Sequence, residues 1–449
     1  MAGYSFGGIS AAGVRTAPAF DLSGVRARER AAGSDNPRAA YAFLLAFIFL
    51  LYLNVPIVMP RFEVVHPAKL VGAAAVLALL AETLFGRRRF SFGLPEGGVL
   101  LGFLGVATLS CLTALWPGLA VQVVGDLMKI VLVYFFVANC AASVRGVRGV
   151  MWTMLLGGLV PAAGVMRNYL TGNVIEGRTG WVGLFANPND LAYSLVILVP
   201  LAACLAVRSR LLTRLVLWGI ILFFAAGIFV TFSRGGLIGL AAVIGLYAWK
   251  RRSLMTWIVI AGMAAAGLFA VAHLWTRGQD FSDLQDDATV RSRLATSEAG
   301  LAMFADHPLF GVGPGCSVVA WPLYAPPGVR TRGALITHNT FIQGLSETGI
   351  TGFIAFFLFI GFGLWHAHQL ARKRLPSHAT PVGAHQPAAG DLDMPRPQPA
   401  EEVRALGTGL EIALWGFVVC GLSAGIMLTW FPYILVGLVS AARRIPGTP

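Results

Sequence analysis

The stretch LVLWGIILFFAAGIFVTFSRGGLIGLAAVIGLYAWKRR, residues 215–252, contains the pattern that decides the fold. Two apolar segments, 215–232 and 235–249, meet at a short polar turn, and a basic run follows the second. A helix that crosses the hydrocarbon core of a bilayer, about 30 Å thick, needs roughly 20 mostly apolar residues. Both segments approach that length, so this stretch predicts two antiparallel membrane-spanning helices.

Apolar segments of the same kind recur along the whole chain. Of its 449 residues, 56% are hydrophobic and 12% are charged, and a soluble domain does not hide that much apolar surface from water. We therefore expect an all-α integral membrane protein with about twelve transmembrane helices. The predicted spans are 41–60, 66–85, 97–116, 119–139, 149–166, 186–206, 215–232, 235–249, 254–273, 338–365, 407–428 and 430–441.

The distribution of charge gives the predicted topology. The formal net charge is +13, but the basic residues stand at the ends of apolar segments. This pattern indicates membrane topology and contact with membrane lipids rather than nucleic-acid binding. A cytoplasmic N-terminus places most Lys and Arg residues in inner segments, as the positive-inside tendency requires. The five cysteines show neither disulfide-framework nor zinc-ligand spacing.

This topology divides the chain into consecutive segments. We expect a disordered cytoplasmic N-terminal tail (1–40), transmembrane helices 1–9 (41–273) with a short periplasmic loop (167–185), a large, partly helical periplasmic loop (274–337), transmembrane helix 10 (338–365), a cytoplasmic linker (366–406), and transmembrane helices 11–12 with a cytoplasmic C-terminus (407–449). The histidines in the linker do not predict a metal site, because no folded frame fixes their geometry.

Several arginines are exceptions to the topology, because they fall on the predicted outer side. They are Arg167, Arg178, Arg234, Arg277, Arg291, Arg293, Arg330 and Arg332, and the candidates for a shared site are Arg178, Arg234, Arg291 and Arg293. Arg234 lies between two short spans, where burial of its charge costs free energy unless an anion or a cavity accepts it. The alternative is an arginine that reaches a lipid phosphate. Since guanidinium groups bind phosphate through forked, charge-assisted hydrogen bonds, the set predicts an anion site.

The segment THNTFIQGLSETGITG, which begins at Thr337, predicts a helix with a polar stripe. Asn339, Gln343 and Glu347 recur every four residues and share one face of such a helix, with Thr337 as its N-cap. A polar stripe that enters the membrane faces a cavity or another helix, so packing between helices is the alternative to a binding role. His338 stands at the outer end, where an imidazole can accept or donate a proton near neutral pH.

The segment FANPNDLA, residues 185–192, predicts the start of a helix. Asn187 precedes Pro188 and is followed three positions later by Asp190, which is the order of a cap, a first-turn proline and a first-turn acid. We favour this structural role over direct contact with a ligand. Asn187 and Asn189 are therefore candidate supporting residues.

Two further features receive structural interpretations. Asp126 and Lys129 lie three apart in the fourth predicted span and can meet on one helix face as a neutralised pair. The glycine-rich GVGPG, residues 311–315, is interpreted as a turn that shapes a loop, because a lone glycine-rich turn is weak grounds for a phosphate cradle. Neither feature predicts a metal site.

Four segments, in this order, resemble the O-antigen ligase family, which shares its core with O-antigen polymerases. They are GRTGWVGLFANPNDLA (177–192), TFSRGGLIG (231–239), RLATSEAGLAMFADHPLFGVGPG (293–315) and HNTFIQGLSETGITG (338–352). The resemblance covers the central and later parts of the chain. The N-terminal spans agree with the family's topology but contain none of its motifs.

The resemblance implies a glycosyltransferase of the bacterial inner membrane whose active site faces the periplasm. It would move a glycan from undecaprenyl pyrophosphate onto a lipid A–core sugar, without nucleotide sugar, cofactor or metal. His338 matches the family's functional histidine. The family's arginines match Arg178, Arg234 and Arg293. Family members often have Trp four residues after the loop arginine, whereas this chain has Ser297, so either Arg291 or Arg293 is the counterpart.

The chemistry of the residues agrees with this implication. Cleavage of a sugar–pyrophosphate bond requires stabilisation of the charge on the leaving group, which fixed arginines can supply. A general base must take the proton of the attacking hydroxyl, and His338 is the candidate. We expect direct displacement with inversion at the anomeric carbon.

Two other functions stay open. A polymerase of the same superfamily could use the same residues to join lipid-linked repeat units. A transporter of lipid-linked glycan would carry polar residues near mid-membrane and an internal repeat, but the sequence offers only Asp126 and Lys129 at mid-span.

Overall fold

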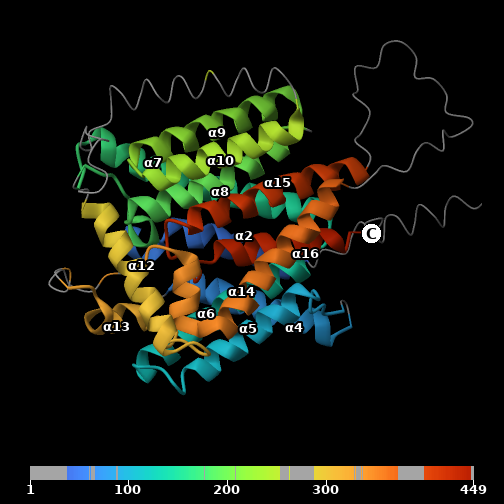
Figure 1. Cartoon of the computed structure of the whole chain (residues 1–449). Helices are drawn as coiled ribbons and strands as arrows, with labels where there is room; N and C mark the ends of the chain where they lie inside the picture. Colours follow the sequence, from blue (N-terminus) through green and yellow to red (C-terminus); the bar gives the residue numbers. More distant parts are fainter. Residues whose placement is uncertain are drawn as a thin grey trace, which may run out of the picture. The chain divides into compact units, whose positions relative to one another are not determined.

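A computed structural model describes residues 38–59, 61, 66–86, 89–175, 177–207, 209–252, 262, 288–327, 329, 335, 337–372 and 399–445. Residues Pro37–Pro449 form one unit and Met1–Asn36 another, and the description below concerns the first. Figure 1 shows its helices by label. Almost all of the predicted span 254–273 and of the predicted tail 1–40 lies outside the described residues, as does 373–398 of the predicted linker.

The regular elements of the described residues are helices. In chain order they are α2 (Arg38–Leu53), α3 (Val55–Val58), α4 (Pro67–Leu84), α5 (Glu96–Ser110), α6 (Pro117–Cys140), α7 (Val144–Leu170), the short 3₁₀ helix η2 (Gly183–Phe185), α8 (Pro188–Val207), α9 (Leu211–Val230), α10 (Arg234–Arg251), α12 (Ala288–Asp306), α13 (Ser317–Tyr324), α14 (Thr340–Arg372), α15 (Pro399–Gly421) and α16 (Phe431–Arg443).

Most of the predicted spans overlap apolar helices in the described residues. Seven of them are long and apolar enough to cross a membrane, namely α4, α6, α7, α8, α9, α14 and α15. The shorter apolar helices α2, α5 and α16 overlap three further predicted spans, and α10 overlaps another. The prediction of an all-helical, multi-pass membrane protein is confirmed. The number of twelve spans stays a prediction.

Helix α8 lies inside the bundle. Within its apolar window 89% of the residues are buried, against 33% in α9. It packs on α7, α9, α10 and α15, several of which run beside it in Figure 1. Because α8 is apolar on all faces, it is surrounded by other helices rather than by one partner and lipid. The residues at its start are therefore held by a fixed framework.

Helix α14 is kinked at Gly349, whose φ of 64° lies in the left-handed region that favours glycine. A Cβ at this position would lie 2.3 Å from the carbonyl carbon of Leu309, so the close approach also requires glycine. The segment that follows α12 lies against the kink, and the Ile350 N–H donates to the Pro308 carbonyl at 2.8 Å. Backbone groups released by the kink are thus paired with this segment.

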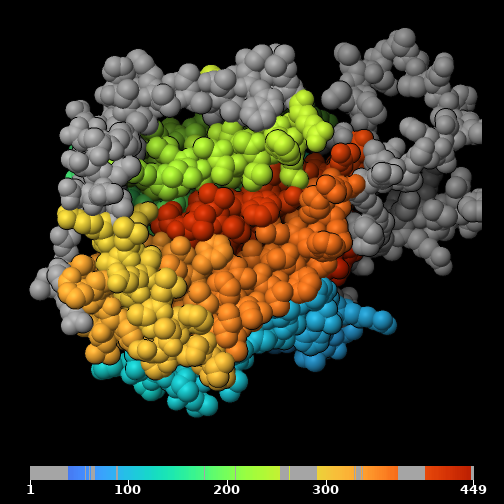
Figure 2. Space-filling model, in the orientation of Figure 1, coloured from blue at the N-terminus to red at the C-terminus, as the bar shows by residue number. Residues whose placement is uncertain are grey.

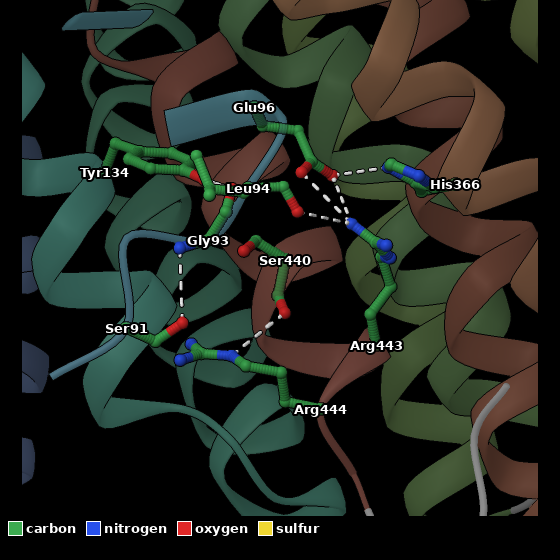
Figure 3. A network of polar contacts seen from close by, with 9 residues as sticks. All are labelled: Ser91, Gly93, Leu94, Glu96, Tyr134, His366, Ser440, Arg443 and Arg444. Atoms are coloured by element: carbon green, nitrogen blue, oxygen red, sulfur yellow. Dashed lines mark hydrogen bonds and ion pairs between the residues drawn. The ribbon is translucent and has the colours of Figure 1, made fainter. Parts of the chain in front are cut away.

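A buried ionic network joins α5, α14 and α16 (Figure 3). Glu96 is 0% exposed, and its Oε1 lies 2.6 Å from Nδ1 of His366. The Nη1 of Arg443 donates to both carboxylate oxygens of Glu96, at 3.1 and 3.3 Å, and to the Leu94 carbonyl at 3.3 Å. Since a buried charge is tolerated only when it is paired and hydrogen-bonded, this network fixes the three helices relative to one another.

Helical structure extends into both ends of the predicted linker 366–406. Helix α14 continues to Arg372, and α15 begins at Pro399. The polar residues there have partners on neighbouring helices, and Nδ1 of His368 lies 2.9 Å from Oε1 of Glu411 on α15. These partners explain why a segment with the composition of a linker is helical at its ends.

The predicted contact between Asp126 and Lys129 is confirmed. The Lys129 Nζ lies 2.7 Å from Oδ1 of Asp126 on α6. Their side chains are 60% and 69% exposed, so the pair lies on the outside of the helix bundle rather than in its interior. The contact neutralises both charges locally, as the helical spacing predicts.

Candidate functional site

The side chain of Asn189 joins three segments of the chain at the start of α8. It is 6% exposed, and its Oδ1 accepts hydrogen bonds from Arg178 Nη2 at 2.5 Å and from Ser233 Oγ at 2.7 Å. Arg178 comes from the segment between α7 and α8, and Ser233 directly precedes α10. The Asn189 N–H donates in turn to Oδ1 of Asn187 at 2.9 Å. Both predicted supporting asparagines therefore help to position an arginine.

Arg234 is the first residue of α10, and Ser233 is the N-cap of that helix. The Ser233 Oγ accepts from the Gly236 N–H at 3.2 Å while it donates to Asn189. Close packing on α8 explains the two glycines, since a Cβ on Gly235 would lie 2.4 Å from the hydroxyl of Tyr193. The sequence SRGG thus places the half-buried Arg234 beside the segment that holds Arg178.

Helix α12 brings Arg293 to the same region. Figure 2 shows α12 on the surface beside α14, and the two helices pack together. Arg293 is half-buried, interacts electrostatically with both Tyr193 and His338, and has an Nε without a hydrogen-bond partner among the described residues. Arg291 is exposed, because residues two apart on a helix point in different directions.

His338 directly precedes α14, and Asn339 caps the helix. The Oδ1 of Asn339 accepts from the second and third N–H groups of α14, at 2.8 and 3.2 Å, and its Nδ2 donates to the Leu422 carbonyl at 3.2 Å. The prediction of Thr337 as N-cap is therefore wrong by two residues. The helix begins only at Thr340, because the asparagine side chain satisfies the first free N–H groups.

The electrostatic surroundings of His338 favour the neutral imidazole. Burial lowers the pKa of His338 below its ordinary value of 6.5, and the positive charges of Arg293 and Arg178 lower it further. A neutral imidazole at neutral pH is ready to accept a proton. The same interactions show that His338, Arg293 and Arg178 lie within electrostatic range of one another.

Gln343 and Glu347 pack against the glycine-rich turn. The carboxylate of Glu347 accepts from Ser317 Oγ at 2.6 Å, from the Gly315 N–H at 3.0 Å and from Gln343 Nε2 at 3.4 Å. Gln343 is 7% exposed and Glu347 2%. These two side chains of the stripe predicted on α14 therefore pack within the protein. Gly313, with φ of 107°, helps to shape the turn.

Sequence reasoning missed three residues that hold the site together. The hydroxyls of Tyr193 on α8 and Ser423 lie 2.8 Å apart, and Ser423 belongs to the segment between α15 and α16. Thr340 Oγ1 donates to the Ala424 carbonyl of the same segment at 2.6 Å. This segment therefore connects the start of α8 with the start of α14. Tyr193 and Ser423 stand outside the quoted motifs, and the motif that contains Thr340 gives no sign of its contact with Ala424.

The geometry can now be compared with known families. Residues 219–357 match the family model described as O-antigen ligase. This match covers less than half of the chain and supports its similarity to the O-antigen ligase family. The matched stretch contains Arg234, Arg293 and His338, whereas Arg178 and Asn189 lie before it. No curated protein matches the chain.

The family match confirms the resemblance that the sequence motifs indicated. The matched family suggests ligase or polymerase activity of a membrane glycosyltransferase-like enzyme and implies lipid-linked glycan substrates. The described residues contain no group of three or more His, Cys, Asp or Glu side chains that could hold a metal ion. The polar groups that converge in the described part of the site are mainly arginines, hydroxyls and amides.

Proposed function

We propose that the chain is an O-antigen ligase. It transfers a glycan from undecaprenyl pyrophosphate to a lipid A–core sugar at the periplasmic face of the inner membrane. The observations that carry the proposal are the family match over residues 219–357 and the electrostatic interaction of Arg178 and Arg293 with His338, which come from three segments distant in the sequence. This displacement needs cations that stabilise the leaving pyrophosphate and a neutral base that accepts the proton of the attacking hydroxyl.

The arginines provide for the leaving group. In the displacement, the bond between the anomeric carbon and the pyrophosphate oxygen breaks, and negative charge accumulates on the pyrophosphate. Arg178 is held in place by Asn189, so its guanidinium is oriented before the donor arrives. Such pre-oriented donors stabilise developing charge without reorganisation during the reaction. Arg234, one residue from Ser233, and Arg293 complete the predicted anion site.

His338 provides for the acceptor. The hydroxyl of the acceptor sugar attacks the anomeric carbon from the side opposite the leaving oxygen, which inverts the configuration. His338 takes the hydroxyl proton as the new bond forms. The lowered pKa of this histidine keeps the imidazole neutral at neutral pH, so it can act as the base.

Transfer of labelled glycan in detergent tests the proposal. Purified protein is mixed with lipid-linked glycan and lipid A–core, and His338→Ala and Arg293→Ala are each expected to reduce transfer by at least about 100-fold. Arg291→Ala is the matched control for Arg293→Ala, since it lies two residues away on α12 and is exposed. Near-normal transfer by His338→Ala would refute the mechanism.

The cell envelope of a knockout strain distinguishes the ligase from its alternatives. Loss of all polymer from lipid A identifies a ligase, whereas lipid A–core with a single repeat unit identifies a polymerase. A protein that moves lipid-linked glycan across the membrane without joining it to an acceptor in detergent would be a transporter.

A further inference from the structure

A cavity lies at the opposite end of α14 from His338. It has a volume of about 470 Å³ and lies between the ends of α8, α10, α14 and α15. Four cations from three of these helices line it, namely Lys250, Arg251, Arg372 and Arg404. Basic residues of cytoplasmic loops commonly extend separately into water, whereas these four basic side chains line one cavity.

The cavity lies far from the candidate active site. Helix α10 begins at Arg234 and ends at Arg251, and 17 steps of 1.5 Å separate the two ends by about 25 Å. This distance is close to the thickness of a hydrocarbon core, about 30 Å. The cavity and the active site therefore lie near opposite surfaces of the membrane, and one ligand headgroup does not occupy both.

An exposed tryptophan marks the depth of the cavity. Trp249 directly precedes Lys250 on α10 and is 67% exposed on the outside of the bundle. Tryptophan side chains collect at the boundary between the hydrocarbon core and water. The cavity is thus at the level of lipid headgroups.

Two of the four cations are held by neighbouring side chains. The Nζ of Lys250 lies 2.7 Å from Oε2 of Glu411, and the guanidinium carbon of Arg251 lies 5.4 Å from the ring centre of Tyr247. These contacts reduce the entropy that a ligand would lose in ordering the cations. The lining is therefore partly preorganised for an anion.

The balance of charge in the cavity is positive. The four cations contribute +4, and Glu401 and Glu411 contribute −2, which leaves +2. Arg372 on α14 and Arg404 on α15 are exposed, and both line the cavity. A cavity of a few hundred Å³ with convergent cations is of the size and charge that a phosphate headgroup requires.

We propose that this cavity binds the phosphate headgroup of an anionic membrane lipid. The acyl chains would leave the cavity toward the surface that carries Trp249. Apolar residues Val207, Ala371 and Ala405 line the cavity together with the cations, as contact with the glycerol and first methylenes requires. The lipid would add to Glu411 of α15, whose carboxylate already pairs with Lys250 of α10 and with His368 of α14.

Binding of phosphatidylglycerol to the full chain tests this site. The protein is purified in detergent, titrated with phosphatidylglycerol, and followed by native mass spectrometry and by its thermal unfolding midpoint. The double variant Arg372→Gln/Arg404→Gln is expected to bind about 30-fold more weakly, because each arginine near an anionic headgroup contributes about a factor of five. Phosphatidylcholine is expected to give no shift.

Matched controls separate this site from a general effect of charge. Arg145→Gln/Arg210→Gln removes two exposed cations that do not line the cavity, and it is expected to bind like the wild type. Equal weakening of both double variants would overturn the proposal, as would unchanged binding by Arg372→Gln/Arg404→Gln. Inorganic phosphate is titrated in parallel, and protection by it equal to that by the lipid would overturn the lipid as the ligand.

Discussion

Replacement of Asn189 by alanine tests whether the placement of Arg178 serves catalysis. The Asn189 Oδ1 accepts one hydrogen bond from a charged guanidinium and one from the neutral hydroxyl of Ser233. A hydrogen bond to a charged group contributes about 1.5–3 kcal/mol and a neutral one about 0.5–1.5 kcal/mol. We therefore expect Asn189→Ala to lower the free energy of unfolding by about 2–4 kcal/mol.

The rate should fall as well, because Arg178 loses the group that orients it. If the bond to Asn189 is realised in the transition state, loss of about 1.5–3 kcal/mol reduces transfer per folded molecule by about 10- to 150-fold. The assay is transfer of labelled glycan in detergent, with folded protein counted by size-exclusion chromatography. Asn189→Asp keeps an acceptor oxygen but neutralises Arg178, so it should reduce transfer without a matching loss of stability.

A control on the same helix separates stability from catalysis. Ser194 is 1% exposed, and its Oγ donates to the Leu191 carbonyl at 2.7 Å within α8. Ser194→Ala removes a buried hydrogen bond without touching Arg178, so transfer per folded molecule should not change. The reasoning would be refuted if Asn189→Ala lost stability but kept transfer per folded molecule within about twofold of the wild type.

Two further predictions concern His338 and the kink of α14. Because the pKa of His338 is lowered, the acid limb of the transfer rate should have its midpoint below pH 6.5, and Arg293→Gln should move that limb upward. Initial rates measured against pH check this, and a wild-type midpoint above 6.5 would contradict it. Gly349→Ala should lower the free energy of unfolding by about 2–5 kcal/mol, from left-handed strain and overlap with Leu309. Gly361→Ala on the same helix meets open space and should leave the thermal midpoint unchanged.

The apolar spans could be predicted from sequence, because the length and composition of each segment are enough to indicate a membrane-spanning helix. The stretch around Arg234 illustrates this, since α9 ends and α10 begins within a few residues of the predicted turn. The predicted helix ends differ more from the observed ones where polar residues pair with distant parts of the chain. His366 pairs with Glu96, which lies 270 positions earlier, and nothing near either residue indicates the pairing.

The composition of the site was predicted in part for the same reason. Arginines on the outer side stand out against the positive-inside pattern, so Arg178 and Arg293 could be selected without a structure. The contacts that position them join distant segments, as between Tyr193 and Ser423, 230 positions apart. For Glu347, helical spacing predicts the face of the helix on which the side chain lies, but it does not predict which loop covers that face.

The fixed ends of α14 have a consequence for how a large donor enters. The start of the helix is tied to the segment between α15 and α16 through Thr340, and its far half is tied to α5 and α16 through His366. The kink between them is filled by the segment after α12. A rigid-body tilt of α14 would break all three sets of bonds at once, so we expect the proposed lipid-linked donor to reach the candidate site without a movement of this helix. His338, directly before its start, would then keep its position throughout the reaction.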